Sequence, residues 1–146
     1  MNLCIKRYEE LNIDELYGVL KARAEVFVVE QNCPYLDLDE RDKKAFHVFL
    51  TEGDEIISYL RVLDKGVLFD EVTIGRVLTK RRRCGLGTQI LKEGINVAKE
   101  RLGAKSIIVE AQTYARGLYE KQGFKQVSEE FLEDGIPHIK MRLDIE

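Results

Sequence analysis

The hydrophobic and polar positions of the first 44 residues change their period twice. Apolar and polar residues alternate over residues 3–8, which predicts a strand. A capping-box signal and a helical stripe then predict a helix over about residues 13–29, with apolar positions at Leu16, Leu20 and Phe27. Residues 31–44 follow neither period and place Pro34 among acidic side chains. A long loop, with room for a short helix, is therefore expected there.

The pattern from residue 46 onward predicts a meander followed by alternating helices and strands. An antiparallel meander is indicated by three strand-like runs with turn residues between them, at residues 46–52, 55–63 and 71–79. A 3.6-residue apolar stripe then predicts an amphipathic helix over residues 86–102, which Gly103 ends. A strand, a helix and a final hairpin complete the chain, at residues 106–111, 113–122, 124–132 and 138–144.

This order of elements, β-α-β-β-β-α-β-α-β-β, predicts a single α/β (α+β) domain over residues 1–146. The sheet should be mixed and mostly antiparallel, with helices on both faces. The 146 residues are 45% hydrophobic, which is enough for one core, and the chain contains no internal repeat or linker-like segment.

Composition and charge exclude several classes of protein. A net charge of −3 argues against a general nucleic-acid binder and leaves one basic cluster, Lys80–Arg83, as a local exception. No apolar run approaches the roughly 18 residues of a membrane span, and no secretory signal is recognisable. The three cysteines lack metal-ligand or disulfide spacing, so a cytoplasmic protein is expected.

The segment before the helix at residues 86–102 is the main candidate for ligand binding. Glycines let a backbone approach a ligand, and the first N–H groups of a helix lack partners within it, so this segment suits a pyrophosphate. Its members are Arg82, Arg83, Cys84, Gly85, Leu86, Gly87 and Thr88. A tight turn with solvated arginines is the alternative. The segment lacks the Gly-Lys-Ser/Thr of a P-loop, and Ile90 replaces the third small residue of a dinucleotide fingerprint.

Two motifs resemble a known family. The order R-x-x-G-x-G over residues 82–87 resembles the coenzyme A pyrophosphate loop of the GNAT N-acetyltransferase superfamily. Residues 115–124 resemble the second motif of that superfamily, A-x-x-L-Y-x-x-x-G-F. Three further segments resemble its small ElaA-like branch, residues 27–35, 74–77 and 133–139. The resemblance covers nearly the whole chain.

The resemblance implies an acyl-CoA N-acyltransferase fold, with a sheet that is splayed between its two central strands near Val77. It implies that acetyl-CoA is the cosubstrate and that its pyrophosphate binds the loop at residues 82–88. Strand backbone around Gly75, Arg76 and Val77 would pair with the pantetheine amides. Gln112 departs from the family pattern, which often has an asparagine in contact with the pantetheine arm.

Acetyl transfer to an amine requires a proton donor and a proton acceptor. The resemblance implies that Tyr119 directs its hydroxyl at the thioester sulfur, and a pKa near about 10 keeps that hydroxyl protonated. An aromatic packed in the core is the alternative for this residue. Glu71, on the strand face assigned to the cofactor, and His138, beside the final turn, are candidate bases. Glu110 ranks third, and exposed or structural roles are the alternatives for all three.

The acceptor is expected to be a cationic amine on a small molecule or peptide, attracted by the acidic segment that contains Glu30 and Asp37. An ordinary solvated loop is the alternative. The spacing Asp37-x-Asp39 lacks the glycine and glutamate of a calcium loop, so no metal site is expected.

We therefore expect an acetyl-CoA-dependent N-acetyltransferase that works by direct transfer. The alternative is a catalytically silent acetyl-CoA-binding sensor or interaction module, because fold does not fix function. No nucleic-acid or membrane partner is expected. The sequence leaves the oligomeric state open, a homodimer included.

Overall fold

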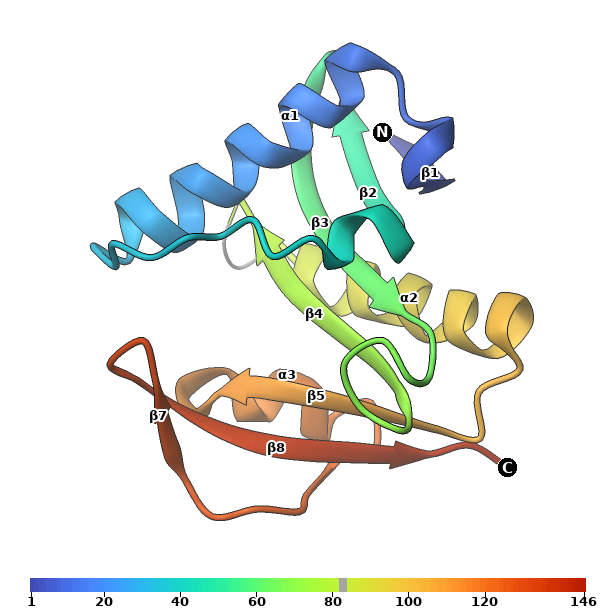
Figure 1. Ribbon diagram of the computed structural model, residues 1–146, viewed down its shortest axis with the longest axis vertical. Coiled ribbons are helices and arrows are strands. Elements are labelled where there is room, and N and C mark those ends of the chain that lie inside the picture. Colours follow the sequence, from blue (N-terminus) through green and yellow to red (C-terminus); the bar gives the residue numbers. More distant parts are fainter. Residues whose placement is uncertain (82–83) are drawn as a thin grey trace.

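One mixed sheet organises the computed structural model, which describes residues 1–81 and 84–146. The strands run in the order β1-β2-β3-β4-β5-β8-β6, with β7 paired to β8 (Figure 1). Their bounds are β1 Asn2–Arg7, β2 Ala45–Glu52, β3 Glu55–Leu63, β4 Val72–Thr79, β5 Ser106–Gln112, β6 Lys125–Gln126, β7 Phe131–Glu133 and β8 Ile136–Asp144. Of the described strand pairs, only β4–β5 is parallel. The predicted mixed, mostly antiparallel sheet is confirmed.

The helices are α1 Ile13–Arg23, α2 Leu86–Leu102 and α3 Arg116–Glu120. A π-helix, η2 (Ala24–Glu30), continues α1, and 3₁₀ turns complete the chain at η1 Tyr8–Glu10, η3 Arg41–Lys44 and η4 Thr113–Ala115. Asn12 caps α1, because its side chain accepts from the Glu15 backbone N–H at 2.8 Å. In the described part of the chain, no helix has the length and apolarity to cross a membrane.

Two predicted elements are shorter in the structure than the sequence pattern indicates. The helix predicted over residues 113–122 is η4 followed by the five residues of α3. The strand predicted over residues 124–132 is two short pieces, β6 and β7. β6 and β7 each pair with β8, and this pairing, not a local period, sets their length. The final turn occurs where it was predicted, with positive φ at Asp134 and Gly135.

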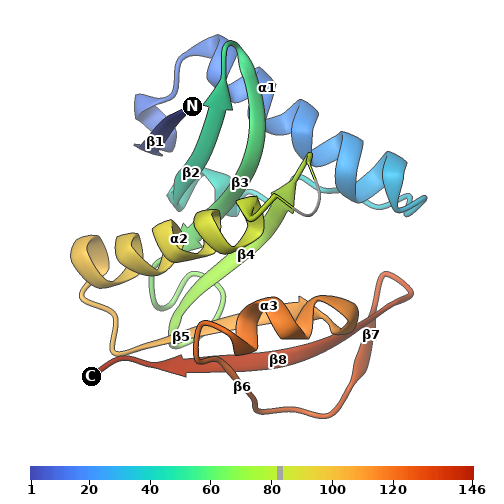
Figure 2. The same cartoon turned by 180° about the vertical axis from the view of Figure 1, so that it is seen from behind.

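Helices cover both faces of the sheet, but not along its whole width. α1 crosses the face that is turned toward the viewer in Figure 1, over β2 and β3, and we call this the front face. α2 and α3 lie on the back face (Figure 2). The most buried positions of α1 and η2 are Val19, Ala22, Arg23 and Val26, one step around the helix from the predicted stripe. No helix of the described residues lies over the front face of β5 and β8 (Figure 1).

The sheet splits between β4 and β5. Their parallel pairing consists of Val72 with Ile107 and Thr73 with Ile108, and beyond this point the strands separate. β4 also contains a bulge: Tyr59 pairs with Leu78 and Arg61 with Gly75, so that Leu60 lies opposite two residues, Arg76 and Val77. The split begins earlier in β4 than the predicted position near Val77.

Candidate active site

A cleft of about 570 Å³ occupies the split of the sheet. Its walls come from β4, the loop over residues 31–41, the end of β5, α3 and the β7–β8 turn. Eight of the predicted site residues line it: Gly75, Arg76, Val77, Gly87, Glu110, Gln112, Tyr119 and His138. The structure thus brings together residues that are far apart in the sequence.

The start of α2 provides backbone donors at one end of the cleft. Gly85 precedes the helix with φ of +77°, a conformation that favours glycine. The Gln89 N–H donates to the Gly85 carbonyl at 3.0 Å, so the N–H groups of Leu86, Gly87 and Thr88 precede the helical hydrogen bonds. These donors and the positive end of the helix dipole suit an anionic group.

The packing of α2 against α3 leaves room for a Cβ atom at Gly87. Such an atom would lie 3.5 Å from the nearest Leu118 side-chain atom, an ordinary van der Waals contact. Of the remaining predicted loop residues, Cys84 is exposed, with its Sγ 3.4 Å from the Arg81 carbonyl oxygen. Arg82 and Arg83 lie outside the described residues.

The neighbouring cations are paired with acidic side chains. Lys80 Nζ lies 2.7 Å from Glu25 Oε2, and Arg81 Nη1 lies 2.8 Å from Glu52 Oε2. The described part of the predicted basic cluster is therefore largely neutralised.

Tyr119 is both a core residue and a wall of the cleft. Its side chain is 6% exposed, and its ring meets Phe124 edge-on with 5.8 Å between centroids. Burial raises the pKa of its hydroxyl well above the ordinary value. The hydroxyl thus stays protonated at neutral pH, which is the form that a proton donor needs.

Glu110 is the best-placed carboxylate on the other side of the cleft. Among residues 1–81 and 84–146, its carboxylate has no hydrogen-bond or ion-pair partner, although Lys140 and Arg41 lie near enough to lower its pKa somewhat. Half-burial raises the pKa of its carboxyl, and the nearby Glu133 carboxylate raises it further. A carboxylate with a raised pKa that faces a cleft is suited to take a proton from an ammonium ion.

His138 lies on the same sheet face as Glu110. The β5–β8 register places it opposite Gln112, and Lys140 opposite Glu110. Its Nδ1 lies 2.7 Å from the Ile136 carbonyl oxygen, which can only accept, so the proton is on Nδ1. In the neutral ring Nε2 is then free to accept a proton, and Glu133 Oε2 lies 4.0 Å from it.

The prediction that Glu71 faces the cleft is wrong. Glu71 precedes β4 at the end where β4 and β5 still pair, and its Oε2 lies 3.6 Å from Arg142 Nη1. Glu71 keeps the strand phase of Thr73 and Gly75, because the bulge begins only at Arg76, but it lies outside the split and is not among the described residues that line the cleft. Glu110 takes the position expected for Glu71, and its signal was a charged residue within a β-branched strand.

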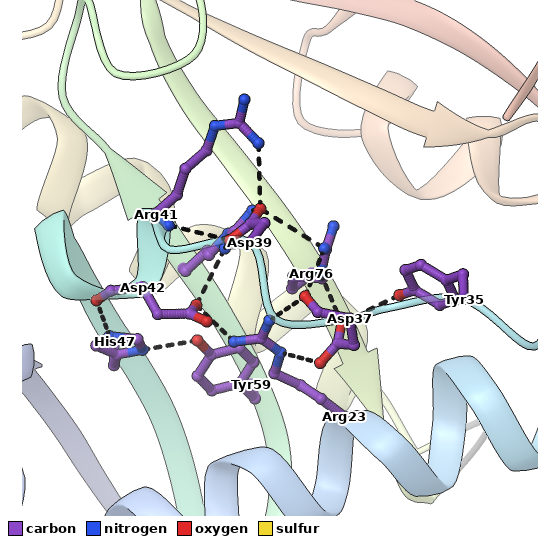
Figure 3. Close-up of polar contacts among 10 residues, drawn as sticks. Arg23, Tyr35, Asp37, Asp39, Arg41, Asp42, His47, Tyr59 and Arg76 are labelled. Carbon is purple, nitrogen blue, oxygen red and sulfur yellow. Dashed lines mark hydrogen bonds and ion pairs between the residues drawn. The ribbon is translucent and has the colours of Figure 1, made fainter. Parts of the chain in front are cut away.

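The predicted acceptor site at Asp37 and Glu30 also requires correction. Asp37 is 9% exposed, and its carboxylate accepts from Arg23 Nε at 2.9 Å and Arg76 Nε at 2.8 Å (Figure 3). Its charge is therefore compensated within the protein and is not available to an acceptor. Glu30 is exposed at the end of η2 and is not among the described residues that line the cleft.

Asp37 belongs to a buried network of paired charges beneath the loop, which the sequence analysis missed. Asp42 accepts from Arg23 at 2.6 Å and from Arg61 at 3.0 Å, and Asp39 accepts from Arg61 at 2.7 Å. Burial alone would raise the pKa of Asp39 and Asp42, but these arginines outweigh burial and hold both pKa values below the usual range. Both carboxylates are therefore ionised and committed to the fold.

His47 closes this network on the side of β2. Its Nε2 donates to the Asp42 carbonyl oxygen at 2.8 Å, so its Nδ1 accepts from the Tyr59 hydroxyl at 2.7 Å (Figure 3). Burial lowers the pKa of His47, which keeps the ring neutral.

Two contacts connect the loop to the far side of the cleft. The side-chain amides of Gln31 and Gln112 bond each other reciprocally, with both distances 3.1 Å. Cys33 Sγ lies 3.4 Å from the Asp134 carbonyl oxygen. Gln112 therefore lies in the cleft, as the motif implied, but its amide already has a protein partner. No cluster of three His, Cys, Asp or Glu residues placed to hold a metal occurs among the described residues.

Comparison with known proteins places this geometry in a family. The sequence profile of the acetyltransferase (GNAT) domain matches residues 8–145. A UPF0039 protein of Schizosaccharomyces pombe is 35% identical over 144 residues, which is 96% of this chain and 95% of that protein. Protein ElaA of Escherichia coli is 34% identical over 142 residues, or 94% of this chain and 93% of ElaA.

Solved structures agree with the sequence relatives. Escherichia coli ElaA superposes with a TM-score of 0.91 at 33% identity, over 97% of this chain and 99% of that chain. An acyl-CoA N-acyltransferase from Pseudomonas aeruginosa superposes with a TM-score of 0.90 at 36% identity, over the same shares of the two chains. The predicted acyl-CoA N-acyltransferase fold is confirmed, and the chain belongs to the acetyltransferase (GNAT) family, with ElaA among its relatives.

Proposed function

We propose that this chain transfers an acetyl group from acetyl-CoA directly to an amine. The observation that carries the proposal is the split of the sheet, which leaves the β4 backbone beyond Thr73 paired with β3 but not with β5, beside the start of α2. In the proposal, this β4 backbone pairs with the pantetheine amides, and the first N–H groups of α2 bind the pyrophosphate. Tyr119 and Glu110 line the same cleft, where the reacting groups would meet.

The proposed reaction forms a C–N bond to the acetyl carbonyl carbon and breaks the thioester C–S bond. Glu110 takes the proton that converts the acceptor ammonium to the free amine and passes it to solvent. The second proton, lost by the nitrogen on acylation, goes to His138 Nε2, while Tyr119 donates its proton to the departing thiolate. Exchange through water returns the His138 proton to Tyr119, so the products are the amide, free thiol and one solvent proton.

The charge of the cleft supports an acceptor amine on a small molecule or peptide. The loop carboxylates are neutralised by arginines, whereas Glu110 and Glu133 lie on the side that no helix covers. An ammonium group is attracted by this pair and reaches it from the open front face. We also propose a cytoplasmic location, which the three free cysteines support.

Thiol release separates this proposal from a silent acetyl-CoA sensor. Acetyl-CoA is incubated with a panel of monoamines, diamines, amino acids and peptides, and free thiol is measured together with the acetylated product. An enzyme releases thiol only with an acceptor present. Binding without thiol release for every amine of the panel would favour the sensor.

Cofactor binding is tested separately by Gly87→Glu. A ligand at about 100 times its Kd stabilises a protein by about 2.7 kcal/mol, so CoA and acetyl-CoA should both raise the melting temperature. The variant places a carboxylate at the proposed pyrophosphate site and should abolish this shift without unfolding the protein. Asn96→Glu adds the same single negative charge on the exposed side of α2 and should keep the shift.

A further inference from the structure

β4 departs from regular strand geometry at a residue that is not glycine. Arg76 has φ of +50°, within the left-handed region that side chains disfavour. It shares the bulge opposite Leu60 with Val77, and both residues line the cleft. Because the local sequence does not favour this conformation, contacts elsewhere in the fold must hold it.

The Arg76 side chain donates two hydrogen bonds to one loop residue, Asp37, and makes a longer ion pair with another, because its Nη2 lies 3.6 Å from Asp39 Oδ2. Arg76 Nε donates to Asp37 Oδ1 at 2.8 Å, and Arg76 Nη2 donates to the Asp37 backbone carbonyl at 2.9 Å (Figure 3). One guanidinium thus binds both the side chain and the main chain of Asp37. Two bonds in one plane fix the direction of the guanidinium as well as its position.

Asp37 is in turn fixed from the side of α1. Arg23 Nε donates to Asp37 Oδ2 at 2.9 Å, and Arg23 Nη2 donates to the same backbone carbonyl at 3.1 Å. The Arg23 side chain is fully buried, so it cannot follow a movement of the loop at low cost. The two arginines hold Asp37 between α1 and β4.

The same residue therefore connects two parts of the proposed active site. The bulge supplies β4 backbone to the cofactor side of the cleft, and the loop that contains Asp37 supplies Cys33, Tyr35, Leu36, Asp39 and Arg41 to the acceptor side. We propose that Asp37 and Arg76 are positioning residues. Their contact aims the backbone N–H groups of the bulge at the thioester carbonyl. It also holds the loop on the acceptor side of the cleft in place opposite that carbonyl. This inference rests on the proposed acetyl transfer.

Arg76→Gly tests the side chain separately from the backbone. Glycine accepts φ of +50°, so the bulge can persist without the guanidinium. We expect kcat to fall about tenfold or more, because small misplacements of reacting groups are costly, while the Kd for CoA changes less than about twofold. Guanidinium ion added at millimolar concentration should restore part of kcat. Asp54→Asn, in the exposed β2–β3 turn, is the control and should match the wild type.

A vibrational measurement distinguishes positioning from structural support. The carbonyl stretch of ¹³C-labelled acetyl-CoA should lie at lower frequency in the wild-type complex than in water, because backbone donors polarise it. In Arg76→Gly and Asp37→Asn the band should move back toward its frequency in water. A contact that only supports the fold would leave the band unchanged.

Three results would overturn the inference. The first is wild-type kcat and carbonyl frequency in Arg76→Gly, and the second is a fall in kcat that guanidinium does not relieve with an unchanged band. The third is loss of the folded state in both variants, which would show that the contact serves stability. Failure of the proposed function is distinct, since the wild-type protein would then release no thiol with any amine.

Discussion

The carboxylates on the two sides of the split sheet differ in whether they have partners. On the β4 side, Asp37, Asp39 and Asp42 are each bonded to at least one buried or half-buried arginine. On the β5 side, Glu110 has no such partner among the described residues, although it is also half-buried. The carboxylates on both sides are thus shielded from solvent, and the two sides differ in whether an arginine pairs with the carboxylate.

This difference in pairing reverses the direction in which the fold shifts the pKa of a carboxyl group. The arginines hold the pKa of Asp39 below its usual range, whereas burial and Glu133 raise the pKa of Glu110. The paired carboxylates therefore stabilise the fold as anions, and the unpaired one is strained as an anion and ready to accept a proton. Acidic residues alone do not identify an acceptor site, and the presence or absence of a partner decides their role.

The largest expected effect is on stability, from Arg23→Met on the paired side. The substitution leaves Asp37 and Asp42 buried with one partner fewer, and losing one member of a buried ion pair typically costs about 3–5 kcal/mol. Urea denaturation measures this change. Glu52→Gln, in the exposed pair with Arg81, should leave the midpoint nearly unchanged. Equal changes in unfolding free energy for the two substitutions would contradict the claim that the buried ion pairs contribute more to stability than the exposed pair does.

Tyr119→Phe should give the next largest effect, on turnover rather than on stability. Removing a general acid typically lowers the rate by about 10²–10⁴, and we expect kcat to fall at least tenfold. The ring and its packing on Phe124 remain, so the melting temperature and the Kd for CoA should change little. Tyr17→Phe, on the exposed side of α1, is the control. A variant that loses stability but keeps its turnover would make the hydroxyl structural.

On the β5 side, Glu110→Gln should lower activity without lowering stability. Without the carboxylate, kcat/KM should fall about tenfold, most strongly at low pH where free amine is scarce. Glu71→Gln, outside the cleft, should stay within about threefold of the wild type. If His138→Ala lowers kcat/KM more than Glu110→Gln does, the first deprotonation belongs to the histidine.

The same variant gives a stability test with a definite sign. The pKa of Glu110 is higher in the folded state than in the unfolded chain, so ionisation costs stability as the pH rises above about 4. Glu110→Gln should therefore raise the melting temperature at pH 7 and have little effect near pH 4. A destabilised variant at pH 7 would mean that the carboxylate has a partner in solution.

Asp39→Asn should show the opposite pH dependence. The folded-state pKa of Asp39 is lowered, so its contribution to stability is complete above the unfolded value of about 3.9 and is lost as the pH falls further. The difference in unfolding free energy between variant and wild type should be constant near neutral pH and begin to shrink below about pH 4. A constant difference down to pH 2 would contradict the assigned ion pairs.

Local sequence patterns were sufficient for most strands, for α2 and for the turn at Gly85 that precedes it. A local pattern of residues marks β3, and the glycines Gly85 and Gly103 mark the two ends of α2. The two motifs also placed Gly87 and Tyr119 in one cleft. Elements that depend on neighbours, such as β6 and β7, were predicted too long.

The charge network escaped prediction because its partners are distant in the sequence. Asp37 meets Arg23 and Arg76 from 14 and 39 residues away, and spacing alone does not reveal such pairs. A signal did exist: Arg23 lies one helical turn from Val19 and Val26, on the buried face of its helix, where a charge requires a partner. No sequence signal marked the bulge, because its residue with positive φ is Arg76 and not the glycine that usually occupies such a position.

The bulge also limits how far the length of β4 can vary. Between the pairs Leu63–Thr73 and Ser58–Thr79, β4 advances six residues while β3 advances five. A deletion of one residue at the bulge would restore equal spacing, so the pairs Tyr59–Leu78 and Ser58–Thr79 could persist and Leu78 could stay in the cluster that it shares with Val19 and Tyr59. The bulge itself would be lost, and with it the irregular β4 backbone that lines the cleft. Insertions and deletions should therefore be tolerated in the β2–β3 turn but not between Gly75 and Leu78.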